Sequence, residues 1–323
     1  MEVSLQKRHL IIFSALTAAS ILIFQISVVF FLFTVPLYVI MRKYGFQYVS
    51  MAAFFVAIVM VTQTLIRGSG IEGDSLRSFL IILELIYPLS LLGGMLVISY
   101  FRGSRKVIFL LLAASAGFYI LSVPVFVHFS GNNEIVTLLK DQIIYVAQMF
   151  SKGAGSADSF ENALLLKELQ PERIVVTTAK LILRNYVFAY FIMLTVAWYF
   201  ADAVIRKTEK RSGIKLVNFR VPEILLWPLI ISLLGVLADL FLGLGWIGYL
   251  MWNSTFIMIL LYGIHGIGLI GYLLVRYKVT RSGRRFLIIL SVAVMLLPGI
   301  NLVLLIGVPV LGVSEMWIRY RTG

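Results

Sequence analysis

The sequence predicts an all-α fold, a polytopic transmembrane helical bundle of about eight to ten spans with a short amphipathic extracytoplasmic segment. Of its 323 residues, 60% are hydrophobic and only 13% are charged, about half the charged share of an ordinary soluble domain. The apolar residues come in blocks of about 20 or more, the length that a helix needs to cross a hydrocarbon core of roughly 30 Å. The absence of cysteine excludes a disulfide framework, a thiolate metal site and a cysteine nucleophile.

The candidate spans are eight apolar blocks, and basic residues mark one side of them. The blocks are 10–41, 47–66, 78–101, 107–128, 185–205, 221–242, 253–275 and 286–317. Lys and Arg concentrate in 102–106, 206–220 and 276–285, whereas 130–184 and 243–252 are balanced or uncharged. Because Lys and Arg accumulate in cytoplasmic loops, the three basic segments and both termini are predicted to be cytoplasmic, with 130–184 outside. The net charge of +13 is therefore a topology signal and does not indicate nucleic-acid binding.

Two blocks, 10–41 and 286–317, run to about 32 residues, which exceeds the 17–25 residues of one ordinary span. Basic residues flank both ends of each block, so the chain should return to the side that it left. Each block is either a tight hairpin of two short helices or one long tilted helix, and the charge pattern favours the hairpin. The predicted turns are Gln25 to Ser27 in the first block and Pro298-Gly299-Ile300-Asn301 in the second.

The spans divide into N-terminal transmembrane helices over 1–129 and C-terminal transmembrane helices over 185–323, with the extracytoplasmic segment 130–184 between them. Within this segment, apolar residues recur near helical spacing in 134–150 and again in 161–170. This pattern predicts amphipathic helices that lie on the outer surface. The segment is either a simple linker or a lid or receptor surface.

The sequence contains neither a P-loop nor an HExxH or GxSxG element. The three histidines are far apart in the chain, which argues against a zinc enzyme. We therefore expect no enzymatic activity, no metal site and no cofactor.

Polar residues within the spans are the candidate ligand-binding residues, because a charge in lipid costs several kcal/mol unless it is paired or hydrated. Glu84, Asp239 and Asn253 are predicted to share the outer leaflet, where they would line one outward polar cavity. His265, among four nearby glycines that permit close approach of a helix or ligand, would lie toward its floor. Pro88 cannot donate to the Glu84 carbonyl and is predicted to open the helix there. The alternative is that each polar residue forms a structural hydrogen bond.

The second half of the chain carries motifs in a recognisable order. They are Asn185-Tyr186, Asn218-Phe219-Arg-Val-Pro222-Glu-Ile-Leu-Leu-Trp227, Asn253, Leu261-Tyr262-Gly-Ile-His-Gly266 and Leu311-Gly312-Val-Ser-Glu-Met-Trp317-Ile-Arg319-Tyr-Arg321. This order resembles the YybS-like family of bacterial membrane proteins, although His265 and Glu315 stand where that family is expected to have glutamine and aspartate. The family is similar in fold to the S-components of energy-coupling-factor transporters. The resemblance implies a receptor in the bacterial cytoplasmic membrane that works with separate ATPase or coupling subunits.

S-components dock onto their coupling subunit through small residues on the first helix, and Ala15 and Ala19 match that spacing. Two functional hypotheses therefore follow from the sequence. The first is a solute-binding transporter subunit that lies in the lipid bilayer and has no ATPase of its own. The second is a structural or scaffolding protein of the cell envelope, in which buried polar residues only hold helices together.

Overall fold

The computed structural model describes residues 2–70, 74–101, 107–130, 137, 141, 145, 171–209, 216–280, 282–283, 300–318 and 320–321. Throughout these residues the secondary structure is helical, and no strand occurs among them. The chain forms two compact units, Met1–Lys210 and Arg211–Gly323. The predicted all-α transmembrane bundle is confirmed, because six of the described helices are long and apolar enough to cross a membrane.

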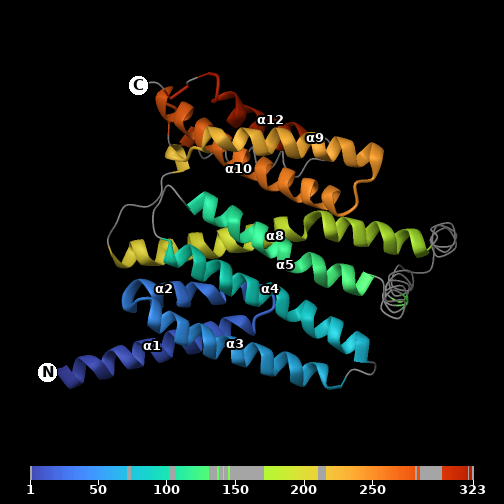
Figure 1. Cartoon of the computed structure of the whole chain (residues 1–323). Coiled ribbons are helices and arrows are strands. Elements are labelled where there is room, and N and C mark those ends of the chain that lie inside the picture. The colour runs from blue at the N-terminus through green and yellow to red at the C-terminus, as the bar shows by residue number, and fades with distance from the viewer. Residues whose placement is uncertain are drawn as a thin grey trace, which may run out of the picture. The chain divides into compact units, whose positions relative to one another are not determined.

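Among its described residues, the first unit contains six α-helices and a short 3₁₀ turn (Figure 1). They are α1 (Glu2–Phe24), η1 (Phe30–Phe33), α2 (Thr34–Tyr44), α3 (Phe46–Gly68), α4 (Asp74–Tyr100), α5 (Val107–Ser130) and α8 (Pro171–Thr208). The predicted spans 47–66, 78–101 and 107–128 correspond closely to α3, α4 and α5. The predicted span 185–205 is the later part of α8, a helix of 38 residues that begins at Pro171 and crosses the expected boundary at 184/185. Proline is favoured at the first position of a helix because a backbone N–H there would have no acceptor within the helix, so its absence costs nothing.

The hairpin predicted for 10–41 is confirmed. The helix α1 ends at Phe24, the chain turns through residues 25–29, and η1 and α2 pack back against α1. The Ser20 hydroxyl donates to the Phe33 carbonyl oxygen at 2.5 Å, and the rings of Phe24 and Phe33 meet edge to face at 5.8 Å. These contacts join the two arms next to the turn.

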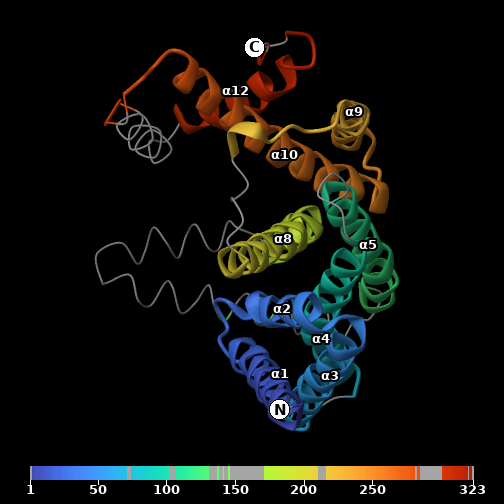
Figure 2. The same cartoon turned by 90° about the vertical axis from the view of Figure 1, so that its left-hand side faces the viewer.

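The short helix α2 lies in the middle of the first unit, in contact with α1, α3, α4 and α8 (Figure 2). Seven of its 11 residues are buried. An 11-residue helix is about 16 Å long, roughly half of the hydrocarbon thickness. It is therefore a core element of the unit and too short to be a complete span.

An aromatic layer joins α4, α5 and α8. The ring of Phe118 stacks on that of Tyr190 at 4.3 Å, and the Tyr190 hydroxyl donates to the Ser90 carbonyl oxygen at 2.8 Å. The same hydroxyl oxygen would lie 2.5 Å from a Cβ placed on Gly94, so only glycine leaves room for this tyrosine. The Tyr87 hydroxyl likewise donates a hydrogen bond to the Tyr186 carbonyl oxygen, at 2.5 Å.

The second unit contains α9 (Leu226–Leu242), α10 (Trp246–Arg276) and α12 (Ile300–Ser314), with the 3₁₀ turns η2 (Leu216–Asn218) and η3 (Glu223–Leu225) before them. Gly243 adopts a left-handed conformation (φ 63°) directly after α9, and Gly245 (φ 58°) precedes α10. Glycine allows these conformations without a Cβ penalty, so the sequence ends one helix and starts the next within four residues.

The helix α10 packs on both α9 and α12, and its contact with α12 depends on glycine. A Cβ on Gly266 would lie 2.1 Å from the Val308 carbonyl oxygen, and one on Gly312 would lie 2.2 Å from that of Tyr262. The two backbones therefore touch directly, which is the close packing that small residues permit between membrane helices. The close helix approach predicted from the glycines around His265 is found at Gly266.

Two sequence predictions fall largely outside the described residues. The first is the pair of amphipathic helices expected in 134–150 and 161–170, of which only residues 137, 141 and 145 are described. The second is the first arm of the hairpin expected for 286–317, which lies outside the described residues. The second arm is described as α12, which starts at Ile300, within the predicted turn. The predicted spans 221–242 and 253–275 correspond to η3 with α9 and to α10.

Candidate functional site

A buried polar cluster lies where α10 meets the end of α12. His265 is on the buried face of α10, with 2% of its side chain exposed, and Glu315 follows the last residue of α12, with 7% exposed. His265 Nε2 is 2.7 Å from Glu315 Oε2. The close α10–α12 crossing at Gly266 and Gly312 brings these two side chains together.

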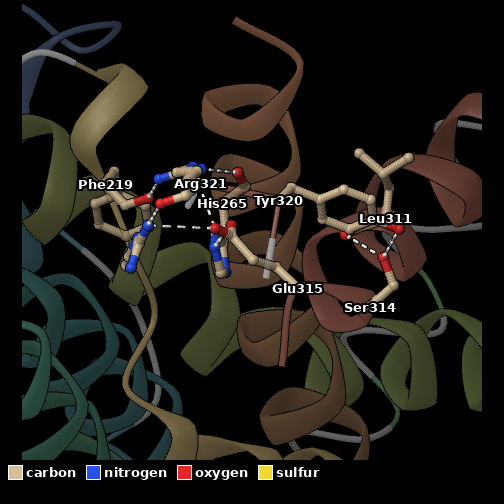
Figure 3. A network of polar contacts seen from close by, with 8 residues as sticks. Phe219, His265, Leu311, Ser314, Glu315, Tyr320 and Arg321 are labelled. Atoms are coloured by element: carbon tan, nitrogen blue, oxygen red, sulfur yellow. Dashed lines mark hydrogen bonds and ion pairs between the residues drawn. The ribbon is translucent and has the colours of Figure 1, made fainter. Parts of the chain in front are cut away.

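Two arginines share the carboxylate of Glu315 with His265. Arg321 Nε lies 3.3 Å from Glu315 Oε1, and Arg220, from the segment before α9, reaches the same oxygen at 3.6 Å. Figure 3 shows the carboxyl group of Glu315 against the ring of His265, with Arg321 on its other side. Arg321 is 4% exposed, whereas Arg220 is 57% exposed. The cluster therefore has a buried centre and one arginine at its edge.

Hydrogen bonds to backbone carbonyls fasten the residues after α12 to α10 and to the segment before α9. Arg321 donates to the Phe219 carbonyl oxygen at 3.0 Å and to that of His265 at 3.4 Å (Figure 3). Arg276 donates to the Tyr320 carbonyl oxygen at 3.0 Å. Burial lowers the pKa of Arg321 and the adjacent Glu315 carboxylate raises it, but a guanidinium stays charged at neutral pH in either case.

Three polar atoms on α10 are buried and have no hydrogen-bond partner among the described residues. They are His265 Nδ1, the Tyr262 hydroxyl oxygen and the Thr255 hydroxyl oxygen. An ionised Glu315 can only accept, so a neutral His265 donates through Nε2 and leaves Nδ1 as an acceptor. The ring of Tyr262 stacks beside that of His265 at 6.4 Å, one turn earlier on the helix. Buried polar groups are nearly always paired in proteins, so a water, ion or ligand that bonds these atoms would stabilise the unit.

Asp239 and Asn253 lie at the other end of the second unit, near the turn between α9 and α10. Asp239 Oδ1 accepts from the Leu244 backbone N–H at 2.9 Å, and Oδ2 accepts from Trp252 Nε1 at 3.0 Å. The Asn253 amide donates to the Tyr249 carbonyl oxygen at 2.8 Å. His265 is 12 residues further along α10 than Asn253, about 18 Å of helix. The second unit thus holds two separate polar regions, with His265 in the region that contains Glu315.

Glu84 belongs to the first unit, where it forms an ion pair with Arg67 at 2.9 Å. The two side chains are 41% and 62% exposed, so this pair lies on the surface of the unit. The helix α4 continues through Pro88 to Tyr100. A cavity that Glu84 shares with Asp239 and Asn253 stays a prediction, since Glu84 lies in a different unit. His265 lies in a polar region separate from Asp239 and Asn253.

The sequence marked His265 as a candidate but not the partners that surround it. Glu315 is the only charged residue within the apolar block 286–317, and an isolated acid in such a block was an available signal. Arg220 and Arg321 belong to basic segments and to the family motifs, and neither property indicates that they meet Glu315. Their roles depend on the fold, because 50 residues separate His265 from Glu315 and 101 separate Arg220 from Arg321.

Comparison with known proteins identifies a family but no function. The model of the DUF2232 family, described as a predicted membrane protein, matches residues 11–309 and so covers most of the chain. No curated protein and no solved structure matches the chain.

Proposed function

The chain belongs to the DUF2232 family of predicted membrane proteins, and from this premise we propose that it is a non-enzymatic subunit that binds a small solute in its second unit. Any active transport would then depend on a separate ATPase. The resemblance to YybS-like proteins and to S-components supports the same role, with both termini on the cytoplasmic side of a bacterial membrane.

The observation that carries this proposal is the pair of unsatisfied atoms at His265 Nδ1 and the Tyr262 hydroxyl. Both residues are almost fully buried, at 2% and 0% exposure. A buried polar group without a partner costs about 1–3 kcal/mol. A ligand that donates to His265 Nδ1 and forms a hydrogen bond with the Tyr262 hydroxyl would remove that cost. Both bonds would contribute to its affinity.

The exposed face of α1 supports a partner subunit. Ile11, Ala15, Ala18 and Leu22 are all exposed and follow one another at helical spacing of three or four residues. We name these four residues the α1 face. Its two central residues are alanines, which would let another membrane helix approach closely. Ala19, the second alanine predicted for docking, is partly buried at the edge of this face.

A scaffolding role has one observation in its favour. The carboxylates of Asp239 and Glu84 both have partners within their own units, as expected of residues that hold helices together. The two roles predict different results when the Tyr262 hydroxyl is removed. Solute binding predicts the loss of a bound small molecule, whereas a scaffolding role predicts no such loss.

The experiment compares Tyr262→Phe with Tyr190→Phe in protein purified in a gentle detergent. Small molecules retained by each sample are extracted and identified by mass spectrometry. Solute binding at Tyr262 predicts that a species retained by the wild type is lost from Tyr262→Phe and kept by Tyr190→Phe, whose hydroxyl bonds the Ser90 carbonyl oxygen. A wild-type protein that retains no small molecule, or a Tyr262→Phe variant that keeps the species in full, would contradict the proposal.

A further inference from the structure

The end of the second unit that carries Arg276 is strongly positive. Residues 211–323 contain ten Lys or Arg, all of them within 211–220, 276–285 and 319–321, against three acids, Glu223, Asp239 and Glu315. The structure brings the described residues of these three segments together, because Arg321 donates to the Phe219 carbonyl oxygen and Arg276 donates to that of Tyr320. Of the ten basic residues, the structure describes Arg220, Arg276, Lys278 and Arg321, all at this end of the unit, whereas Asp239 lies near the opposite end of α9.

Arg220 and Arg276 converge at this end. Arg220 donates to the Arg321 carbonyl oxygen at 3.4 Å, and Arg276 donates to the carbonyl oxygen of the preceding residue, Tyr320, at 3.0 Å. Both arginines are exposed. A guanidinium has five N–H donors in a planar fork, so both retain donors after these bonds. Two guanidinium groups held next to each other by the carbonyl oxygens of consecutive residues can together bind an anion that has several oxygen atoms.

Large apolar side chains lie exposed within or directly before the same segments. Tyr277, directly after α10, is 75% exposed, and Trp317 and Ile318, after α12, are 69% and 54% exposed. Trp and Tyr are enriched where membrane helices cross the lipid headgroup region. The combination of exposed aromatic residues with arginines at a helix end is typical of the boundary between lipid and water.

From this geometry we propose that Arg220 and Arg276 bind the phosphate of an anionic phospholipid of the inner leaflet. The lipid is favoured over a soluble anion because Trp317 and Ile318 offer an apolar surface to its acyl chains beside the charged site. Anionic lipids of the cytoplasmic leaflet attract basic segments next to membrane helices, with about 1 kcal/mol for each Lys or Arg. Lys278, also exposed, adds to this attraction.

Lipid binding would also stabilise the candidate site. Arg220 contacts the Glu315 carboxylate at 3.6 Å, and Glu315 is the partner of His265. A bound phosphate would hold Arg220 and the segment around Tyr320 and Arg321 in place. The ligand-facing His265 would then be more ordered in anionic membranes than in neutral ones.

The test measures lipid binding to the full-length protein by native mass spectrometry, with phosphatidylglycerol and phosphatidylcholine of identical acyl chains. We expect the wild type to bind phosphatidylglycerol more tightly, and Arg276→Gln to lose roughly tenfold in that affinity, as for a charge-assisted hydrogen-bonded contact. Lys207→Gln, an exposed basic residue of α8 in the first unit, is the matched control and should bind as the wild type does. Among the described residues, the Arg276 side chain bonds a backbone carbonyl oxygen on the surface, so its variant should fold.

Three results would overturn the proposal. The first is equal binding of the two lipids by the wild type. The second is an equal loss in Lys207→Gln and Arg276→Gln, which would indicate general charge attraction. The third is displacement of phosphatidylglycerol by inorganic phosphate at similar concentration, which would assign the site to a soluble anion.

Discussion

Gly312 of α12 lies so close to Tyr262 of α10 that a Cβ at position 312 would stand 2.2 Å from the Tyr262 carbonyl oxygen. The same Cβ would lie 2.9 Å from the Gly266 backbone nitrogen. Both contacts involve backbone atoms, which cannot rotate away as a side chain would. The position of α12 against α10, and with it the meeting of Glu315 and His265, therefore depends on the absence of a side chain at 312.

Gly312→Ala should therefore lower the free energy of unfolding by about 1–3 kcal/mol, because overpacking forces the two helices apart. Gly307→Ala in the same helix is the matched control, since a Cβ there meets no atom within 4 Å. Alanine is favoured over glycine in a helix by about 1 kcal/mol, so the control should be neutral or stabilising. Thermal unfolding in detergent measures both, and equal midpoints would refute the close crossing.

Much of the fold could be predicted from the sequence because span length and charge placement are local properties. The six long helices and the turn after Phe24 follow from apolar block length and flanking Lys and Arg. The central position of α2 could not be predicted in this way. Its apolar residues look the same whether they face lipid or neighbouring helices, and only the packing against α1, α3, α4 and α8 distinguishes the two.

The candidate site was predictable only in part for a related reason. His265 and Glu84 could be predicted as unusual because a polar group in lipid is energetically costly. The residue that pairs with each of them could not be predicted in this way. For Glu84 the partner is Arg67, 17 residues earlier on the adjacent helix. For His265 the partner is Glu315, which the family resemblance singled out as an unexpected residue without indicating that the two touch.

Glu315→Gln should destabilise the second unit by about 3 kcal/mol, because it leaves the buried Arg321 without a charged partner. Glu84→Gln is the control, since its pair with Arg67 lies on the surface and such pairs contribute at most about 1 kcal/mol. Thermal unfolding in detergent compares the two variants. A loss at Glu84 as large as that at Glu315 would show that burial does not distinguish these ion pairs.

The topology can be tested within the first unit by introduced cysteines, because the native chain has none. Gly70, between α3 and α4, and Thr208, at the end of α8, are both exposed. The positive-inside rule places Thr208, next to Lys207, in the cytoplasm and Gly70 outside. A membrane-impermeant thiol reagent should therefore label Gly70→Cys in intact cells and Thr208→Cys only after lysis. Labelling of both variants in intact cells would reject this orientation.

The α1 face gives a test of partner docking. Ala15→Leu and Ala18→Leu should reduce co-purification of a partner, because a bulky side chain keeps two helix backbones apart. Ala116→Leu on α5, another exposed alanine in a helix of the first unit, is the matched control. Quantitative mass spectrometry of chains that co-purify with each variant is the measurement. Docking through this face is rejected if the three variants retain every partner equally.

The turn between α9 and α10 separates the structural role of Asp239 from a ligand-binding one. Its carboxylate bonds both the Leu244 backbone N–H and Trp252 Nε1, and a Cβ on Gly248 would lie 2.0 Å from Oδ1. The side chain is therefore enclosed by its own turn. Asp239→Asn should lower the free energy of unfolding by about 1–3 kcal/mol, because an amide has one acceptor oxygen where the carboxylate has two.

Trp252→Phe removes the other partner of the same hydrogen bond, so the two substitutions form a double-mutant cycle. If the bond stabilises the turn, the double variant should be more stable than the sum of the single losses predicts, by about 0.5–3 kcal/mol. Thermal or denaturant unfolding in detergent supplies the four values. Additive losses would show that this bond contributes little to the stability of the turn.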